Sequence, residues 1–312
     1  MGHGHGNNKA HKHENAHRAK NGEAKRTLKE QPRESSGGGG GGKGKGIDPL
    51  TPAVLAVLEK HTGLGSAEAW RNIWFLTSKA EQDNDDLSGT FLTDKGESLF
   101  GYASALSYDF KDRGVTLGIV GWTTANDGKD ANGDAPELFK IYKALGGEDL
   151  MPLAAGCTKS KDACAKLIKK IQSLADDPAW IQAQWTQLVT KSDTGAYIYN
   201  TMQTFKKIGI DTPSALAIGT VLDASLNQGH DGKDGGCTNL IKLAVKGDED
   251  ATLAKYNKWR RGVAGTNEYN EPRSNGEARA DMYEKLRKAK VFSLVGAAAA
   301  KAVKDAVSWE MK

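Results

Sequence analysis

Residues 108–124 read YDFKDRGVTLGIVGWTT, and this stretch decides the fold that the sequence predicts. Its apolar half, residues 115–120, is rich in β-formers, and the glycines around it let backbone come close to backbone or to a ligand. Asp112 and Arg113 stand at the start of the apolar run. We therefore predict a short hairpin that carries a carboxylate and a guanidinium at its mouth.

A helical pattern over residues 67–82 lies upstream and brings Glu81 to the C-terminal end of the helix. Trp70 and Trp74 fall on the apolar face of that helix and are predicted to be core residues. A carboxyl group at a helix end, opposite a short sheet with a second carboxyl group, is the layout that lysozyme-like glycosidases use across a cleft. The sequence thus predicts two carboxyl groups, one from Glu81 and one from the hairpin.

Several motifs in a fixed order then support a family resemblance. Residues 113–121 match the pattern R-G-x-T-x-G-I-x-G. The other matching segments are S-x-A-E at residues 78–81, an aspartate followed six residues later by a glycine within residues 220–232, and the arginine-bearing segments KYNKWRR (255–261) and EARADMYEKL (277–286). Over about residues 47–295 the sequence resembles the chitosanases of glycoside hydrolase family 46.

The resemblance implies a mainly α-helical, lysozyme-like α+β fold, in which two helical lobes flank a cleft with a small β-hairpin sheet. Residues 47–312 would form this catalytic domain, whereas residues 1–46, rich in His, Lys and Gly, are predicted to be a disordered arm and linker. Helical patterns cover residues 52–62, 67–82, 136–145, 162–174, 178–190, 197–208, 212–228, 252–261, 276–290 and 293–311, and a hairpin can form near residues 91–99.

The resemblance also implies an inverting acid/base mechanism, with Glu81 as the general acid because burial at the end of an apolar helix raises a carboxyl pKa. The family places its base aspartate where Lys111 stands here, which is a clear departure. Asp112 is the first candidate for the base and Asp109 the second. Since strand alternation would point Lys111 and Asp112 to opposite faces, a bulge or an altered turn must re-aim one acid. Thr116 would hold the attacking water.

Residues 127–134, DGKDANGD, have three interpretations. Their alternating acids resemble a calcium loop, but Leu138 stands where the bidentate glutamate is needed. The resemblance instead implies that Asp134, just ahead of the next helix, faces the substrate, and that Arg113 is a second substrate-binding residue. An ordinary solvated turn is the remaining alternative.

The helix predicted over residues 212–228 is apolar almost all round, which is typical of a helix in the centre of a domain. Asp223 lies in its middle, and a buried carboxylate must be paired. The resemblance implies that Arg260 and Arg279 are its partners. We interpret the three residues as a structural salt-bridge network that braces the cleft.

Charge and composition narrow the classes of partner. The chain carries +4 overall and residues 1–46 carry +6, so +4 minus +6 leaves −2 on the remainder. A mildly acidic domain suits a cationic polymer better than nucleic acid.

No apolar run reaches 18 residues, so no membrane span is expected. We expect a monomer without cofactor or metal, since no Cys-x-x-Cys motif or Cys–His cluster is present.

Three cysteines are too few for a scaffold held together by disulfides. Cys157 and Cys164 lie close in sequence and could bridge a loop to the start of a helix, or both could be free buried thiols. Cys237 would then stay free or be the alternative partner.

The predicted function is endo-cleavage of β-1,4-linked glucosamine polymer, that is, chitosan. Peptidoglycan is an alternative substrate on the same fold, and a glycan-binding module without catalysis is a third hypothesis because the usual base is displaced. A secreted, extracellular enzyme is expected, although residues 1–46 lack the apolar segment of a signal peptide.

Overall fold

The computed structural model of the chain describes residues 47–82, 90–93, 96–105, 110–192, 194–263 and 276–308. The predicted arm, residues 1–46, lies outside the described residues, as do the side chains of residues 80–82. The helices are α2 (Pro52–Thr62), α3 (Ala67–Gln82), η2 (Leu99–Gly101), α4 (Phe110–Arg113), α5 (Ala135–Ala144), α6 (Met151–Ala154), α7 (Lys161–Ser173), α8 (Pro178–Val189), α9 (Tyr197–Lys207), α10 (Ala215–Gln228), α11 (Gly236–Leu243), α12 (Glu249–Val263), α13 (Gly276–Lys288) and α14 (Ala297–Ala306). The strands are β1 (Ala103–Ser104), β2 (Thr116–Leu117), β3 (Trp122–Thr123), β4 (Ala125–Asn126) and β5 (Lys129–Asp130).

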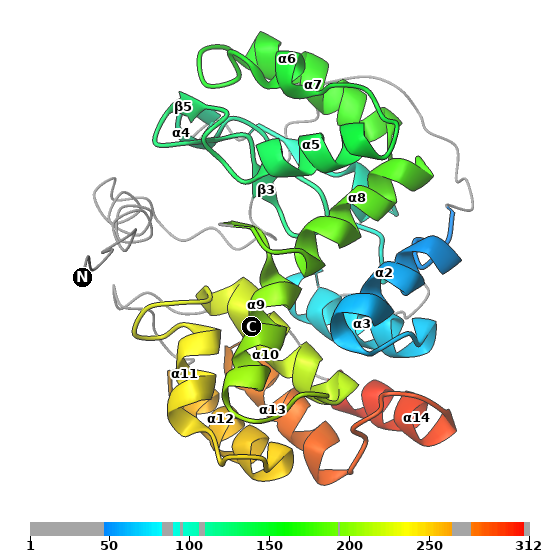
Figure 1. The fold of residues 1–312 in the computed structure, drawn as a ribbon, viewed down its shortest axis with the longest axis vertical. Coiled ribbons are helices and arrows are strands. Elements are labelled where there is room, and N and C mark those ends of the chain that lie inside the picture. The colour runs from blue at the N-terminus through cyan, green and yellow to red at the C-terminus, as the bar shows by residue number, and fades with distance from the viewer. Residues whose placement is uncertain are drawn as a thin grey trace, which may run out of the picture.

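The elements form two groups (Figure 1). The upper group holds the strands together with α4 to α7, and the lower group holds α9 to α14. Helix α8 runs from the upper group toward α9, and α2 and α3 lie beside it. This mostly helical arrangement with a small antiparallel sheet is the fold class that the sequence predicts.

Capping chemistry explains why the helices begin where they do. The Thr51 hydroxyl accepts a hydrogen bond from the Val54 N–H at the start of α2, where proline takes the first helical position. Helix α10 begins later than the sequence indicates, because Ser214 and not Thr212 is its N-cap residue. The Ser214 hydroxyl accepts from the Ala217 N–H, and Pro213 precedes the helix instead of opening it.

The sheet is shorter than predicted. Strand β2 pairs antiparallel with β1 and β3, and Ile119 and Val120 belong to the β2–β3 turn and not to a strand. Gly118 in this turn has φ +75°, and a Cβ added there would lie 2.8 Å from Trp122 Cε3 and 2.7 Å from Gln184 Oε1. The turn can therefore sit against α8 only because residue 118 has no side chain.

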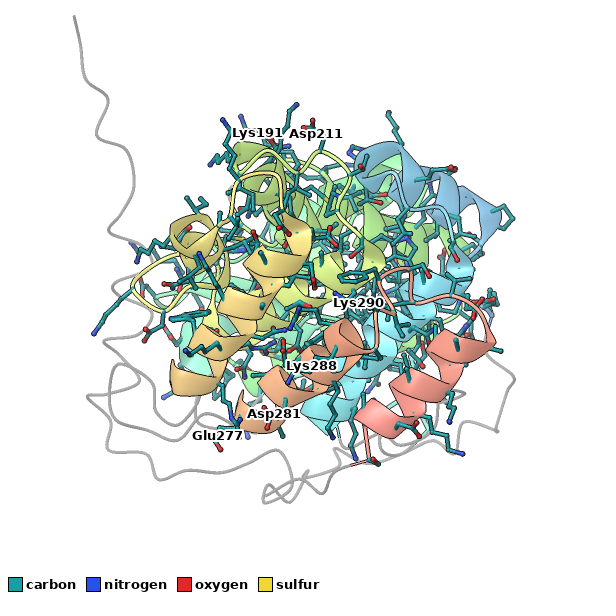
Figure 2. All side chains as sticks on the ribbon, turned by 90° about the horizontal axis from the view of Figure 1, so that it is seen from below. Lys191, Asp211, Glu277, Asp281, Lys288 and Lys290 are labelled. Atoms are coloured by element: carbon teal, nitrogen blue, oxygen red, sulfur yellow. The ribbon has the colours of Figure 1, made fainter. Side chains whose placement is uncertain are left out.

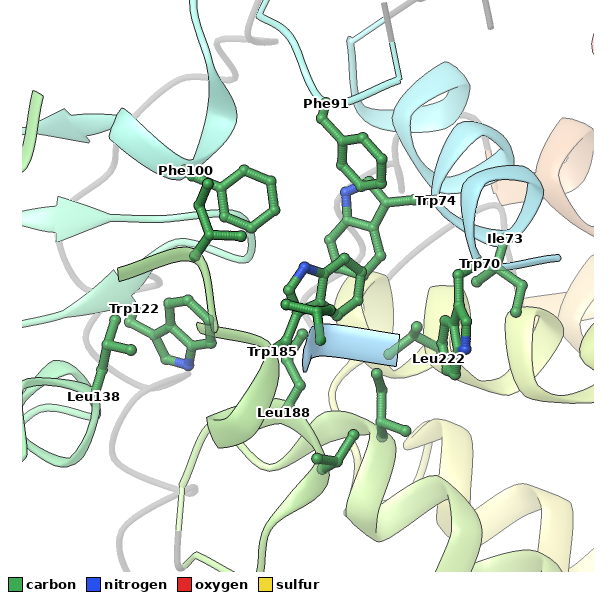
Figure 3. Close-up of a cluster of buried hydrophobic side chains, with 14 of the residues drawn as sticks. Trp70, Ile73, Trp74, Phe91, Phe100, Trp122, Leu138, Trp185, Leu188 and Leu222 are labelled. Atoms are coloured by element: carbon green, nitrogen blue, oxygen red, sulfur yellow. The ribbon is translucent and has the colours of Figure 1, made fainter. Parts of the chain in front are cut away.

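An aromatic cluster forms the core between α3, α8 and the segment before the sheet (Figure 3). The Trp185 ring lies at its centre, with centroid distances of 5.3 Å to Trp74, 6.1 Å to Trp70 and 6.2 Å to both Phe91 and Phe100. Such pairs contribute about 0.5–1.5 kcal/mol each beyond the area that they bury. The prediction that the α3 tryptophans are core residues is confirmed.

Buried amides on α8 fix the sheet to this core. Gln184 donates from Nε2 to the Phe100 carbonyl (3.0 Å) and accepts at Oε1 from the Ile119 N–H (3.0 Å). Gln187 donates from Nε2 to the Asp134 carbonyl (2.9 Å). These side chains pair buried backbone groups that would otherwise lose their hydrogen bonds to water.

A second, smaller hydrophobic cluster fills the lower group between α9, α10, α11 and α12, with Phe205, Val221, Leu240 and Tyr256 among its members. No helix in the described part of the chain has both the length and the apolar character needed to cross a membrane.

Candidate active site

Helix α3 carries the predicted acid. Its bounds match the sequence prediction, and the Glu81 backbone lies in its last turn. The Glu81 side chain, like the whole of Asp109, lies outside the described residues. One turn earlier the helix is deeply buried: Thr77, Ser78 and Lys79 are at most 4% exposed, and the Ser78 hydroxyl donates to the Thr90 carbonyl (2.8 Å).

Asp112 lies on a helical turn ahead of β2, so the strand alternation considered for residues 111 and 112 does not apply. Residues 110–113 form α4, which Gly114 closes by donating its N–H to the Phe110 carbonyl (2.8 Å). Successive side chains therefore diverge around a helix instead of alternating across a sheet. Lys111 is exposed, whereas Asp112 is half-buried. The sequence analysis expects a bulge or an altered turn at this point, and the structure has a helical turn there.

Two contacts fix the turn relative to the strands. The Asp112 carbonyl accepts from the Gly128 N–H (3.1 Å), which ties α4 to the β4–β5 hairpin. The Val115 N–H donates to the Thr124 hydroxyl (2.9 Å). Gly114 has φ +68°, and a Cβ there would lie 2.2 Å from that hydroxyl oxygen, so no larger residue fits between α4 and β2.

Thr116 opens β2 four residues after Asp112, opposite Ser104 on one side and Thr123 on the other. It is half-buried, as is Arg113 at the end of α4. The structure thus brings Asp112, Arg113 and Thr116 together on one short helix–turn–strand segment.

Asp134 occupies the residue before α5 without capping that helix. Its Oδ1 accepts a hydrogen bond from the Thr123 N–H, so the carboxylate is attached to the end of β3. This contact, which the sequence does not indicate, places Asp134 in the same sheet region as Thr116.

Residues 125–130, which overlap the candidate calcium loop, form a hairpin and do not have the form of such a loop. Strands β4 and β5 pair through a turn at residues 127–128. The Asp130 carboxylate accepts hydrogen bonds from the Gly156 N–H (2.7 Å) and the Thr158 N–H (3.1 Å). Within the described residues no group of three or more metal-ligating side chains occurs.

The Asp130 contacts make stability depend on pH. Burial raises the pKa of Asp130, but the Thr158 and Gly156 N–H groups outweigh it, so the pKa lies below its usual value. A depressed folded pKa stabilises the fold above the unfolded value of about 3.9, and this stabilisation disappears as the pH falls through the folded pKa. We expect the free energy of unfolding of the wild type to exceed that of Asp130→Asn by a constant amount above about pH 5.

Below about pH 4 this difference should shrink, because the wild-type carboxylate becomes protonated. Urea unfolding of both proteins between pH 3 and pH 7 measures it, with Asp127→Asn on the same hairpin as the control. A difference between Asp130→Asn and wild type that stays constant down to pH 3 would refute this account of Asp130.

Asp223 lies in the centre of α10 with no exposed surface, together with two arginines that are equally buried. Arg260 Nη2 donates to Asp223 Oδ2, and Arg279 Nη1 donates to Oδ1 (3.0 Å). The Arg260 guanidinium also lies 5.7 Å from the centroid of the Tyr283 ring. The structure thus brings together the three residues that the sequence analysis assigned to one network.

The cysteines are free in this structure. Cys157 and Cys164 are fully buried, and Cys164 Sγ donates to the Cys157 carbonyl (3.0 Å). Of the two alternatives left open by the sequence, the structure therefore shows buried thiols. Cys237 is far along the chain and belongs to the second hydrophobic cluster.

His230 forms contacts that the sequence analysis did not predict. Its ring stacks on Tyr197 (4.9 Å between centroids), its Nε2 lies 3.1 Å from Asn200 Nδ2, and its Nδ1 lies 3.6 Å from Cys237 Sγ. Asn200, His230 and Cys237 border a cavity of about 370 Å³ between α9 and α11. The glycine-rich sequence around His230 is typical of a flexible loop. The contacts of the histidine with Tyr197, Asn200 and Cys237 are visible only in the fold.

The similarities of the chain to known proteins agree with this geometry. The native chitosanase of Bacillus subtilis MY002 is 23% identical, with a TM-score of 0.50 over 74% of this chain and 93% of that one. A mutant of that chitosanase, solved in complex with 6 GlcN, gives a TM-score of 0.51 at 23% identity, covering 74% of this chain and 93% of the other. A family 46 chitosanase of Gynuella sunshinyii, in complex with chitotetraose, gives 0.51 at 21% identity, covering 74% and 92%.

These likenesses show that the chain has the fold of the solved chitosanases. No protein-family model matches the chain. A chitosanase from Niallia circulans is 30% identical over 254 residues, which cover 77% of this chain and 77% of that protein. The chain therefore belongs to the chitosanases, as its resemblance to glycoside hydrolase family 46 predicts.

Proposed function

We propose that this protein cleaves chitosan internally by an inverting mechanism, with Glu81 as the general acid and Asp112 as the general base. Inversion needs one protonated carboxyl group to donate to the leaving oxygen and one carboxylate to activate water on the other face of the sugar. The α4 turn is the observation that supports Asp112 as the base. On a strand, Lys111 and Asp112 would point to opposite faces, whereas on a helical turn successive side chains do not alternate in this way.

Thr116 is proposed to position the attacking water. It follows Asp112 by one tight glycine turn and lies in the middle strand of the sheet, where pairing on both sides fixes its backbone. A hydroxyl group held in this way can accept a hydrogen bond from water while the base removes a proton. Arg113 and Asp134 are assigned to substrate binding, and the contact with Thr123 holds the Asp134 carboxylate in place.

The buried arginine network is proposed to brace α3 beneath the acid. Asp223 balances one of the two guanidinium charges, and Arg260 lies over the Tyr283 ring. Helix α10, which carries Asp223, packs on α3, and α12 and α13 pack on α10. These contacts connect the arginines of α12 and α13 to α3 through α10.

The enzyme is proposed to act outside the cell as a monomer, without nucleic-acid or membrane partners. The near-neutral, slightly acidic charge of residues 47–312 supports a cationic polysaccharide as the partner.

Reducing-end release from chitosan and from purified peptidoglycan tests both the substrate and the base. We expect wild-type activity on chitosan and a loss of about 10²- to 10⁴-fold in kcat for Asp112→Asn. Asp305→Asn on α14, far along the chain from the site, is the control and should retain wild-type kcat. Full activity in Asp112→Asn together with loss in Asp109→Asn would move the base to Asp109, and activity on peptidoglycan alone would overturn the substrate assignment.

A further inference from the structure

Two thiols lie together beneath the active-site turn, where loop residues lead into α7. Cys157 and Cys164 are seven residues apart, and both have 0% exposed surface. The Cys164 thiol donates a hydrogen bond to the backbone carbonyl of Cys157 (3.0 Å). This contact holds the Cys164 sulfur beside the backbone of the other cysteine, and a disulfide needs two cysteines that lie this close together.

The pair is connected to the segment that carries Asp112. A Cβ added to Gly114 would lie 3.5 Å from Cys157 Cβ, so Cys157 packs directly under the residue that closes α4. On either side of Cys157, the N–H groups of residues 156 and 158 donate to the Asp130 carboxylate. Helix α7, which carries Cys164, packs on β1 and η2.

We propose that Cys157 and Cys164 are an oxidation site, at which a low-molecular-weight disulfide such as oxidised glutathione converts the two thiols into a disulfide bond. The bond would fasten the segment under the α4 turn to the first turns of α7. This inference goes beyond the glycosidase function and does not depend on it.

The reaction proceeds by two exchanges. One cysteine loses its proton to solvent, and its thiolate attacks the small disulfide, forming a mixed disulfide and releasing one small thiolate. The other cysteine then loses its proton and attacks the cysteine sulfur of the mixed disulfide, forming the Cys157–Cys164 bond and releasing the second small thiolate. The two cysteines lose two electrons, the small disulfide gains them, and the two protons reappear on the released thiols.

Burial sets the rate of the first exchange. The hydrogen bond with Cys164, and then burial, raise the pKa of Cys157, which keeps it a thiol in the closed structure. Since neither sulfur is exposed, the small disulfide can react with a cysteine only after the loop before α7 opens. We therefore expect oxidation to be slow in buffer and faster in urea concentrations below the unfolding transition.

The test equilibrates the full chain with oxidised glutathione and then counts free thiols in denaturant. We expect the count to fall from three to one, with a trypsin-resistant link between the peptides that contain Cys157 and Cys164. Trypsin cleaves after Lys159 and Lys161, so only the disulfide would hold these peptides together. The oxidised protein should melt about 5 °C higher than the reduced protein, because the bond constrains the unfolded chain.

Matched variants separate this site from the third cysteine. In Cys237→Ala the oxidation-dependent rise in Tm should persist, and in Cys164→Ala it should vanish. Three free thiols after equilibration, stable glutathione adducts without the internal link, or a link to Cys237 would each overturn the proposal. The peptide map of the wild type decides between these outcomes even if the Cys164 variant is unstable.

Discussion

Replacing Glu81 by glutamine is expected to lower kcat on chitosan about 10³-fold, because the amide keeps the shape of the side chain but cannot donate the proton that the leaving oxygen needs. The residue lies in the last turn of α3, and Thr77, Ser78 and Lys79 just before it are at most 4% exposed. Burial disfavours a charged carboxylate and thereby keeps a carboxyl group protonated near neutral pH. Initial rates of reducing-end release across a range of chitosan concentrations separate kcat from KM.

KM should change little in this variant, since the substitution removes an interaction that matters mainly in the transition state. The neighbouring residue in the same turn, Gln82, supplies the control. The variant Gln82→Ala should retain kcat within a few fold. A fall in kcat as large in Gln82→Ala as in Glu81→Gln would show that the end of α3 had been disturbed and that no proton donor had been identified.

Replacing Asp223 by asparagine is expected to destabilise the fold by about 3–5 kcal/mol, since it removes the carboxylate that faces two buried guanidinium groups. Asparagine keeps nearly the same volume, so the loss reflects charge and not a cavity. Urea unfolding followed by circular dichroism measures it as a fall in the midpoint concentration.

An ion pair on the surface supplies the matched control. Arg261 Nη2 lies 3.4 Å from Asp281 Oδ2, and the two side chains are 60% and 42% exposed. Figure 2 labels Asp281 among the other side chains. Exposed pairs contribute little to stability, so Asp281→Asn should unfold near the wild-type midpoint. If both variants lost the same stability, the buried network would not be the brace that we propose.

The sequence predicted the helices best where capping residues and apolar periodicity agree. Helix α3 has the predicted bounds, and α8 begins at the predicted proline because Asp177 caps it. The sequence also placed Asp223 with Arg260 and Arg279, since a charge inside an apolar helix requires partners and the family resemblance indicated which ones.

The local geometry of the active-site segment could not be predicted in the same way. Residues 110–113 form one helical turn, which is too short for periodicity to reveal. The β-formers Ile119 and Val120 lie in a turn, because Gly118 and Gly121, both with positive φ, and the contact with Gln184 override their strand propensity. Contacts between segments far apart in the sequence determine the conformation of this segment, and a single sequence does not show such contacts.

Lys79 is a further case that sequence reasoning missed. A lysine near the end of an amphipathic helix is usually exposed, yet its side chain is only 1% exposed here. Lys79 lies five residues after Trp74, so helical periodicity turns it away from the face of the core tryptophans and does not indicate its burial.

Helix α8 has a consequence for how this enzyme could evolve. Gln184 and Gln187 on this helix hold the turn after β2 and the backbone carbonyl of Asp134, so the strand with Thr116 and the segment with Asp134 are both attached to one helix. Helix α8 also contacts α2, α5 and α9. A substitution that shifts α8 would move both segments together, so selection could change the positions of two proposed site residues without replacing either of them.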